Sequence, residues 1–127
     1  MASFGFTKDH EWARLDGDVA VCGISDYAQK ALGDIVYVEL PPIGKKFKQG
    51  EQVAVVESAK AASEVYAPID GEVVAVNDLL SSDSGKVNTA AESDGWFFKL
   101  KPVNASQIGT LMDAAAYQGF VKGLLAG

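Results

Sequence analysis

The sequence predicts a mainly β domain, a sandwich or a barrel built from short strands. Short runs rich in β-branched and aromatic residues recur at close intervals, with Gly, Pro, Asn and Asp between them. In addition, a phrase of glycine and acid followed by valines occurs three times, at residues 17–21, 50–55 and 71–76. Glycine supplies the positive φ of a tight turn, and valine favours the strand that follows it.

The chain has 127 residues, a length that predicts one domain. Its formal net charge of −6 argues against nucleic acid or an anionic membrane as the partner, because phosphate binding relies on clustered lysine and arginine. Cys22 is the only cysteine, which excludes a disulfide within the chain and suggests a reducing compartment. No apolar run approaches the roughly 18 residues of a membrane span, and the first residues do not resemble a signal peptide. We therefore expect a soluble intracellular protein.

Each predicted strand is a short apolar run that stops at a residue unsuited to a sheet. The run at 35–40 alternates and ends at Pro41, which has no N–H to donate to a β-ladder. The run at 96–101 alternates toward its end and stops at Pro102. Together with the valine-rich runs, the predicted strands cover residues 19–21, 35–40, 53–56, 65–68, 71–76 and 96–101.

Two segments predict helices. Ser25 has the side chain of an N-cap for a helix over residues 26–32, and Gly33 suits its C-terminus. A second helix is predicted to begin at Ser106, because the apolar residues after it recur at i, i+3, i+4 and i+7. These residues are Ile108, Leu111, Met112 and Ala115, and a continuation or a further short helix holds Tyr117, Phe120, Val121 and Leu124. We expect these apolar faces to pack against the core.

Lys60 lies alone among small residues at 57–63, between two valine-rich runs. Because both runs favour strands and a helix this short is marginal, we expect a turn here with the lysine exposed. A long amine held out by small neighbours is what a modifying enzyme needs in order to acylate it. The alternative is a solvated charge that blunts a turn.

Other candidate chemistry is weak. His10 and Glu11 begin like the zinc-protease helix motif, but the second histidine of that motif is missing. A pair of Cys22 and His10 as nucleophile and base is not favoured, because Cys22 lies in a valine-rich strand and free cysteine is usually buried. The lysines at 45–48 indicate a solvated hairpin edge. The sequence therefore offers no independent catalytic site.

Several blocks of the sequence resemble one known family. Residues 57–68 (ESAKAASEVYAP) and 71–77 (GEVVAVN) are similar to the lipoylation region of glycine cleavage system H proteins. Further blocks, in the same order, resemble that family's N-terminal signature, first helix, following strand, last strand and C-terminal helix. These blocks are KDHEW at 8–12, GISDYAQ at 23–29, LGDIVYVELP at 32–41, GW at 95–96 and LMDAAAY at 111–117. The resemblance covers nearly the whole chain.

The resemblance implies a hybrid barrel-sandwich of the lipoyl- and biotinyl-carrier type, with two antiparallel sheets, a short N-terminal helix and C-terminal helices. It implies one lipoyl-carrier domain over residues 1–127, with a core at about 15–101 and a helical extension at about 105–124. Lipoate would be amide-linked to Lys60 at a hairpin tip.

The resemblance further implies a non-catalytic carrier of the glycine cleavage system. The carrier would take an aminomethyl group from a pyridoxal-phosphate glycine decarboxylase to a tetrahydrofolate-dependent aminomethyltransferase. Dihydrolipoamide dehydrogenase would then reoxidise its dithiol, and a lipoate ligase or a lipoyl or octanoyl transferase would attach the cofactor. We expect a monomer, in the cytoplasm if the source is bacterial and in the mitochondrial matrix if it is eukaryotic.

In that family the loaded arm can fold back into a cleft. The matching positions here are Glu11, whose carboxylate could pair with the aminomethyl ammonium, and more loosely Asp9 and Glu64. Glu11 could equally be an ordinary surface carboxylate, because exposed ion pairs are generally weak.

The chain departs from the family pattern in places. Ala59 replaces the usual valine before the lysine, which should leave modification intact. At 84–86 and 91–92 the common proline, glutamate, leucine and tyrosine are replaced, so we expect a more mobile loop over residues 81–94.

Related carriers fit less well. A biotin carrier normally has methionines around its lysine. The lipoyl domain of a 2-oxo acid dehydrogenase usually has aspartate before it, and lacks both the start at 10–12 and the C-terminal extension. Two alternatives stay open: an H-like protein that mainly donates lipoyl groups to other enzymes, and a scaffold that is not lipoylated, although a scaffold would have no use for the small residues around Lys60.

Overall fold

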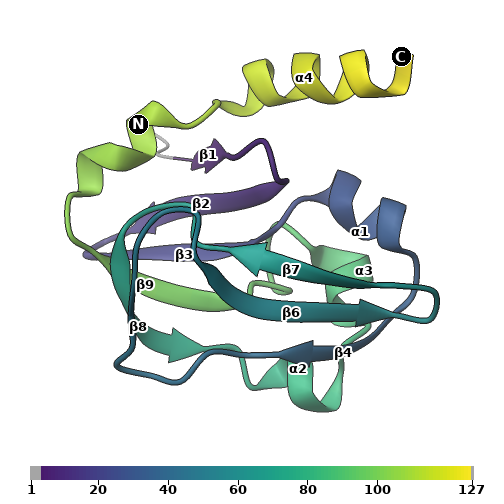
Figure 1. Ribbon diagram of the computed structural model, residues 1–127, viewed down its shortest axis with the longest axis horizontal. Helices are drawn as coiled ribbons and strands as arrows, with labels where there is room; N and C mark the ends of the chain where they lie inside the picture. Colours follow the sequence, from purple (N-terminus) through teal and green to yellow (C-terminus); the bar gives the residue numbers. More distant parts are fainter. Residues whose placement is uncertain (1–3, 127) are drawn as a thin grey trace.

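The computed structural model describes residues 4–126, with side chains described as far as residue 124. Two antiparallel sheets form the body of this part, which confirms the mainly β fold (Figure 1). The larger sheet has the order β1-β2-β3-β9-β8-β5, and the smaller has the order β4-β6-β7. In the larger sheet the strands are β1 (Phe4–Phe6), β2 (Glu11–Asp16), β3 (Val19–Ile24), β5 (Lys46–Phe47), β8 (Gly71–Val76) and β9 (Phe98–Pro102). In the smaller sheet they are β4 (Ile35–Glu39), β6 (Gln52–Ser58) and β7 (Ala62–Tyr66).

Short helices join and cover the sheets. They are α1 (Asp26–Leu32), α2 (Leu79–Ser82), α3 (Lys86–Ala90), the 3-10 helix η1 (Ala105–Thr110) and α4 (Ala114–Ala126). The prediction for α1 is confirmed at both ends, because the Ser25 hydroxyl accepts from the Ala28 N–H at 3.1 Å and Gly33 has a φ of 84°. The C-terminal segments η1 and α4 run beside β1, at the opposite end of the molecule from α2 (Figure 1).

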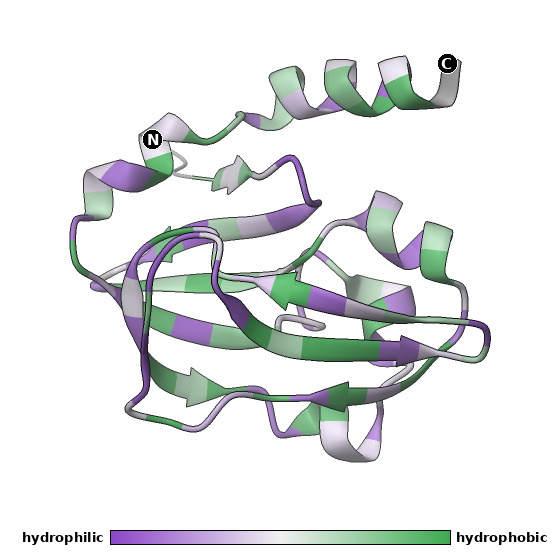
Figure 2. Cartoon of the chain, in the orientation of Figure 1, coloured by the Kyte–Doolittle hydropathy of each residue, from purple (hydrophilic) through white to green (hydrophobic). Residues whose placement is uncertain are grey.

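The main core lies between the two sheets. Inward side chains of β6, β7, β8 and β9, such as Val56, Val65, Val73 and Leu100, are buried together. The middle of β6 is accordingly hydrophobic, whereas the β1–β2 connection is hydrophilic (Figure 2). A second buried cluster lies under α4 and comprises Phe6, Trp12, Val21 and Tyr117. Packing on both faces of the larger sheet therefore fixes the C-terminal extension to the body.

The prediction of one helix from Ser106 through residue 115 is wrong. The chain leaves η1 at Leu111, which has extended backbone angles, and α4 begins only at Ala114. Between them Met112 pairs with Phe6, donating its N–H to the Phe6 carbonyl at 3.0 Å and accepting from the Phe6 N–H at 2.8 Å. This bridge to β1 interrupts the helix, because the backbone groups of Met112 are used outside it.

The unusual sequence at 81–94 suggested one irregular loop, but the segment is partly helical. It contains the end of α2 and all of α3. Asn88 on α3 accepts from the Ile35 N–H at 2.9 Å, and its amide donates to the Gly33 carbonyl and to Gln29 at 2.9 Å each. One side chain therefore fixes this segment to the start of β4 and the end of α1.

The sheets also extend beyond the predicted core. Strands β1 and β2 begin at Phe4 and Glu11, ahead of the predicted core boundary at residue 15, and both pair within the larger sheet. The lysine-rich segment at 45–48 contributes β5, an edge strand whose Phe47 is buried. These strands are short or apolar on one side only, so their sequence pattern is weak.

Candidate functional site

Lys60 lies at the tip of the β6–β7 hairpin. Strand β6 ends at Ser58 and β7 begins at Ala62, with Glu57 paired to Ala62, so Lys60 is in the connection between them. The lysine and its neighbours Ala59 and Ala61 are exposed. In Figure 1 this connection projects at the edge of the molecule, away from both chain ends.

Ser58 shapes the turn that displays the lysine. Its hydroxyl accepts from the N–H groups of Lys60 at 3.3 Å and Ala61 at 3.0 Å, and lies 3.1 Å from the Ala61 carbonyl, to which it donates. The Ser58 N–H also donates to that carbonyl at 2.7 Å. Serine hydroxyls stabilise turns in this way. The backbone groups of the turn are therefore bonded by Ser58 and not by the Lys60 side chain.

The hairpin tip rests on the link between α1 and β4. The Ala59 N–H donates to the Asp34 carbonyl at 2.9 Å. The Lys60 Cε lies 3.5 Å from the point where a Cβ on Gly33 would stand. Because Gly33 has a positive φ and no side chain, it ends α1 and leaves room for the lysine stem. The Asn88 amide, which binds the residues on both sides of Asp34, holds this support in place.

Glu11 is buried and is not the ordinary surface carboxylate that the sequence left open. It is 2% exposed, at the start of β2 under the C-terminal extension. Its carboxylate accepts from the Thr7 hydroxyl at 2.6 Å and from the Tyr66 N–H at 3.3 Å. Burial raises the pKa of Glu11 to about 7, although both hydrogen bonds favour the charged form. Near neutral pH the Glu11 carboxyl group is therefore partly ionised, and its ionised form can accept a cation.

Glu11 lines a concavity of about 350 Å³. Its walls come from the β1–β2 turn, the turn before β6, the end of β7 and the C-terminal extension. The lining residues include Phe6, Thr7, Asp9, Gln49, Tyr66, Met112 and Phe120. Apolar walls around one buried carboxylate suit a slender apolar ligand with a cationic end. This concavity is called the Glu11 cleft below.

The other two predicted cleft residues, Asp9 and Glu64, are exposed, whereas Glu11 is buried. Asp9 lines the cleft and is exposed. Glu64 is exposed on β7, where its carboxylate accepts from the Tyr66 hydroxyl at 2.8 Å. Thr7 and Tyr66, which hold the Glu11 carboxylate, were not predicted from the sequence. The spacing of Thr7 four residues before Glu11 is a local signal, whereas nothing in the sequence points from Glu11 to Tyr66.

His10 connects the cleft to the C-terminal helix. It is the one non-glycine residue with positive φ, 72°, in the described part of the chain. Its Nδ1 is hydrogen-bonded to the Tyr117 hydroxyl at 2.7 Å, and that hydroxyl is bonded to Ser25 Oγ at 2.6 Å. Cys22 is fully buried in β3, where its thiol donates to the Ala20 carbonyl at 3.6 Å, and burial raises the pKa of that thiol. A buried thiol that stays protonated and bonds its own strand does not serve as a nucleophile with His10.

Strand β7 connects the Lys60 turn to the Glu11 cleft. Lys60 lies two residues before its start at Ala62, and Tyr66 at its end donates to Glu11. At about 3.3 Å per residue, the four steps from Ala62 to Tyr66 cover about 13 Å. The structure therefore places the amine and the buried carboxylate at opposite ends of one short strand.

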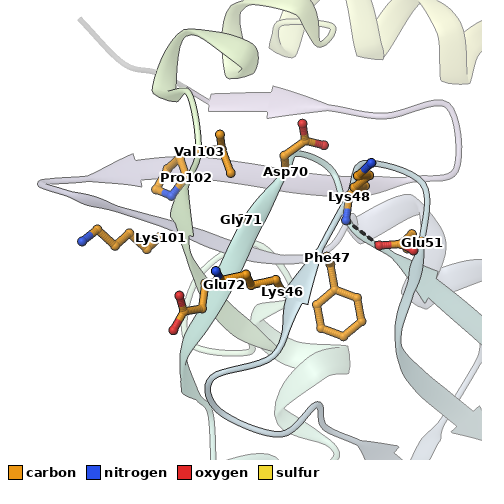
Figure 3. A pocket seen from close by; sticks show the side chains of 10 residues that line it. All are labelled: Lys46, Phe47, Lys48, Glu51, Asp70, Gly71, Glu72, Lys101, Pro102 and Val103. Atoms are coloured by element: carbon orange, nitrogen blue, oxygen red, sulfur yellow. Dashed lines mark hydrogen bonds between the residues drawn. The ribbon is translucent and has the colours of Figure 1, made fainter.

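A larger concavity, about 710 Å³, contains neither of these residues (Figure 3). It lies on β5, β8 and β9, and its lining contains both lysines and carboxylates. At its edge the Lys48 N–H donates to the Glu51 carboxylate at 2.6 Å. Within residues 4–126 no group of three His, Cys, Asp or Glu side chains is placed to hold a metal ion. This concavity therefore adds no residue to the site formed by Lys60 and Glu11.

An exposed lysine at a hairpin tip, on two antiparallel sheets, defines the class of carrier domains that hold a prosthetic group on such a lysine. Residues 4–123 match the family described as "Glycine cleavage H-protein". The chain belongs to that family. Its members are non-catalytic carriers of the glycine cleavage system that bear a lipoyl-lysine and work with the P, T and L proteins of that system.

Individual relatives agree over almost the full length. A glycine cleavage system H protein from Parvibaculum lavamentivorans is 52% identical over 124 residues, covering 98% of this chain and 99% of that protein. One from Xanthobacter autotrophicus is 56% identical with the same coverage. The crystal structure of a glycine cleavage system H protein from Mycobacterium marinum is similar with a TM-score of 0.86 and 32% identity, covering 94% of this chain and 97% of that one.

These relatives are bacterial proteins. None of the helices in the described part of the chain is long and apolar enough to cross a membrane.

Proposed function

We propose that Lys60 is the residue that carries the lipoyl group, and that through it this chain moves the aminomethyl group of glycine from the decarboxylase to the aminomethyltransferase. The observation that carries the proposal is the exposed Lys60 at a turn of small residues, held by Ser58 and supported from below by Asp34. When bound, the lipoyl group supplies a dithiol on a long tether, which raises its effective concentration at a docked enzyme.

Attachment requires only what the turn provides. The Lys60 ammonium must lose a proton so that its Nζ can attack the carbonyl carbon of an activated lipoyl or octanoyl donor, an acyl adenylate or an acyl thioester. The new C–N bond forms as the bond to the activating group breaks, the leaving group departs with the electron pair, and Nζ releases a second proton. A lipoate ligase or a lipoyl or octanoyl transferase fits this step.

The Glu11 cleft is proposed to receive the cationic end of the carried group. The Thr7 hydroxyl and the Tyr66 N–H orient the carboxylate, and the C-terminal extension forms one wall of the cleft. Asp9 at the cleft and Glu64 beside Tyr66 add negative charge near the entrance. A bound cation favours the ionised form of Glu11, because an opposite charge nearby lowers the pKa of a carboxyl.

We further propose that residues 1–127 act as one carrier domain and that the protein works as a monomer. The buried cluster between α4 and β1 supports the single domain, because it packs the C-terminal extension on the sheet that holds Glu11. Since the relatives are bacterial, the cytoplasm is the proposed location.

The attachment site is tested by the intact mass of protein produced in cells that supply lipoate. We expect one lipoyl addition, which is lost in Lys60→Arg and kept in the control Lys48→Arg, an exposed lysine outside the hairpin. Peptide mapping should place the addition within residues 57–63. An addition that survives Lys60→Arg would refute the assignment.

The cleft is tested by the lifetime of the aminomethyl-loaded protein without partners. We expect Glu11→Gln to shorten this lifetime at least several-fold at pH 8, because the ammonium loses its counter-ion. Asp9→Asn should have a smaller effect, since Asp9 is exposed. An unchanged lifetime in Glu11→Gln would remove Glu11 from this role and leave Lys60 unaffected.

A further inference from the structure

A β-bulge in β4 exposes two neighbouring apolar side chains. Ile35 pairs with Ser58 and Tyr37 with Glu57, so Val36 is an extra residue in β4. In a regular strand successive side chains point to opposite faces. Here Val36 is 57% exposed and Tyr37 is 51% exposed, whereas Ile35 and Val38 are buried on either side. The bulge thus turns a buried position outward without disturbing the core.

The exposed pair lies next to Lys60. The β6 partners of the bulge, Glu57 and Ser58, are three and two residues before the lysine. The residue that precedes β4, Asp34, accepts the Ala59 N–H at the hairpin tip. Since β4 is the edge strand of the smaller sheet, no further strand in the described structure covers it.

The same face of the smaller sheet is negative. Residues that pair directly across strands share a face, and Tyr37, Glu57 and Ala62 form one such row. Glu39, Val55 and Glu64 form the next row. The three glutamates are exposed, and neither row contains lysine or arginine. A partner that covers this face would need apolar contacts for Val36 and Tyr37 and a basic rim.

The position of the face selects one partner. During attachment the acyl carbon must come within bonding distance of Nζ, so the attaching enzyme must enclose the hairpin tip and the strand positions beside it. Enzymes that act on the finished arm work at its far end, a full arm length from Lys60. We propose that Val36, Tyr37 and Glu39 form the docking surface for the enzyme that attaches the lipoyl group. This inference rests on the proposed role of Lys60.

The test uses unmodified full-length protein, a bacterial lipoate–protein ligase, lipoate and ATP, with lipoyl addition followed by intact mass. For Val36→Ser/Tyr37→Ser we expect KM for the carrier to rise at least 10-fold while kcat changes less than threefold, because aromatic anchors dominate such interfaces. The matched control is Ile43→Ser/Val103→Ser, which removes two apolar side chains that are 64% and 80% exposed elsewhere. Thermal melting should show that both variants are folded.

Charge provides an independent arm of the test. Glu39→Lys should raise KM several-fold at low salt, and the effect should shrink at high salt because exposed charges are screened. Asp18→Lys, an exposed acid in the β2–β3 turn, is the control for net charge. A KM for the β4 variants equal to that of their controls would overturn the docking surface.

The outcomes separate the two proposals. If wild-type protein gains no lipoyl group at Lys60, the proposed function fails, and with it the inference. If wild type is modified and the β4 variants are modified equally well, only the docking surface fails. A raised KM toward glycine decarboxylase with unchanged attachment would assign the face to that enzyme, which also overturns the inference as stated.

Discussion

Two hairpin turns in this protein are stabilised in the same way, by a side-chain hydroxyl that accepts backbone N–H groups, but they differ in how far their functional side chains are exposed. In the β6–β7 turn the Ser58 hydroxyl accepts the N–H groups two and three residues ahead, of Lys60 and Ala61. In the β1–β2 turn the Thr7 hydroxyl accepts those two and four residues ahead, of Asp9 and Glu11, at 3.2 and 3.1 Å. The first turn displays an amine to solvent, whereas the second leads into a buried carboxylate.

The difference arises from what covers each turn. Within the described residues, the Lys60 turn contacts the α1–β4 link, and Ala59, Lys60 and Ala61 are exposed. The Thr7 turn is covered by the C-terminal extension, through Met112 paired with Phe6 and Tyr117 bonded to His10. Local hydrogen bonds therefore set the shape of a turn, but its electrostatic character depends on segments about a hundred residues away.

The largest expected contrast between the turns is in pH dependence. The carboxyl group of Glu11 ionises near 4.5 in the unfolded chain, and its pKa is raised to about 7 by burial in the fold. Folding stability is therefore lost as pH rises from 4.5 to 7, by about 3 kcal/mol once the loss is complete. In Glu11→Gln this loss should be absent. Urea unfolding at pH 5 and pH 8 measures it, and an equal pH dependence in wild type and variant would contradict the burial argument.

Removing the cover should affect the Thr7 turn alone. Tyr117→Phe keeps the ring and loses the hydroxyl that bonds His10 and Ser25, at a cost of about 2 kcal/mol in unfolding free energy. Hydrogen exchange at Glu11 should speed up, whereas exchange at Ala61 should not change. Tyr66→Phe is the control, because its bond to Glu64 is exposed and should contribute little. Equal changes in exchange at both turns would show that the cover is not local.

Removing the two turn hydroxyls should separate their roles. Thr7→Val leaves one Glu11 oxygen without its hydroxyl donor, so it should cost about 1–2 kcal/mol at pH 8 and less at pH 5, where Glu11 is largely protonated. Ser58→Ala should cost about 1 kcal/mol at both pH values, because no ionisable group depends on it. Unfolding curves at the two pH values decide this. An equal loss of unfolding free energy at both pH values for Thr7→Val would contradict a role of the hydroxyl in stabilising the ionised Glu11 carboxylate.

The smallest expected effect is at Lys60 itself. Lys60→Gln removes the charge that acylation would remove and should change the unfolding free energy by no more than about 0.5 kcal/mol, since exposed side chains rarely contribute more. Thermal melting checks this. A larger loss would mean that the lysine stem on Gly33 is structural, which would count against a residue free to be modified.

The features predicted correctly from the sequence are local ones. The β6–β7 turn, helix α1 with its Ser25 cap, and most strands follow from neighbouring residues and the period of the apolar pattern. Lys60 is conspicuous because small residues surround it and strands flank it. The resemblance added the family and the positions that match its cleft.

The features that were missed depend on distant contacts. The burial of Glu11 requires β1, η1 and α4 together, and its partner Tyr66 comes from the other sheet. The helix predicted from Ser106 through residue 115 was wrong because Met112 pairs with Phe6, more than a hundred residues earlier, whereas the further helix that holds Tyr117 is confirmed as α4. The segment at 81–94 forms helices anchored by Asn88, whose three partners lie at least 53 residues before it. No periodicity within a short window reports such pairings.

Strand β7 sets the separation between Lys60 and the Glu11 carboxylate. Lengthening the β6–β7 hairpin by two residues on each side would keep every side chain on its face and the core intact, yet carry the amine about 7 Å farther out. The proposed lipoyl group, whose length does not change, would then have a longer path to the Glu11 cleft. Under the proposed function, the five residues of β7 set the distance that the lipoyl group has to span.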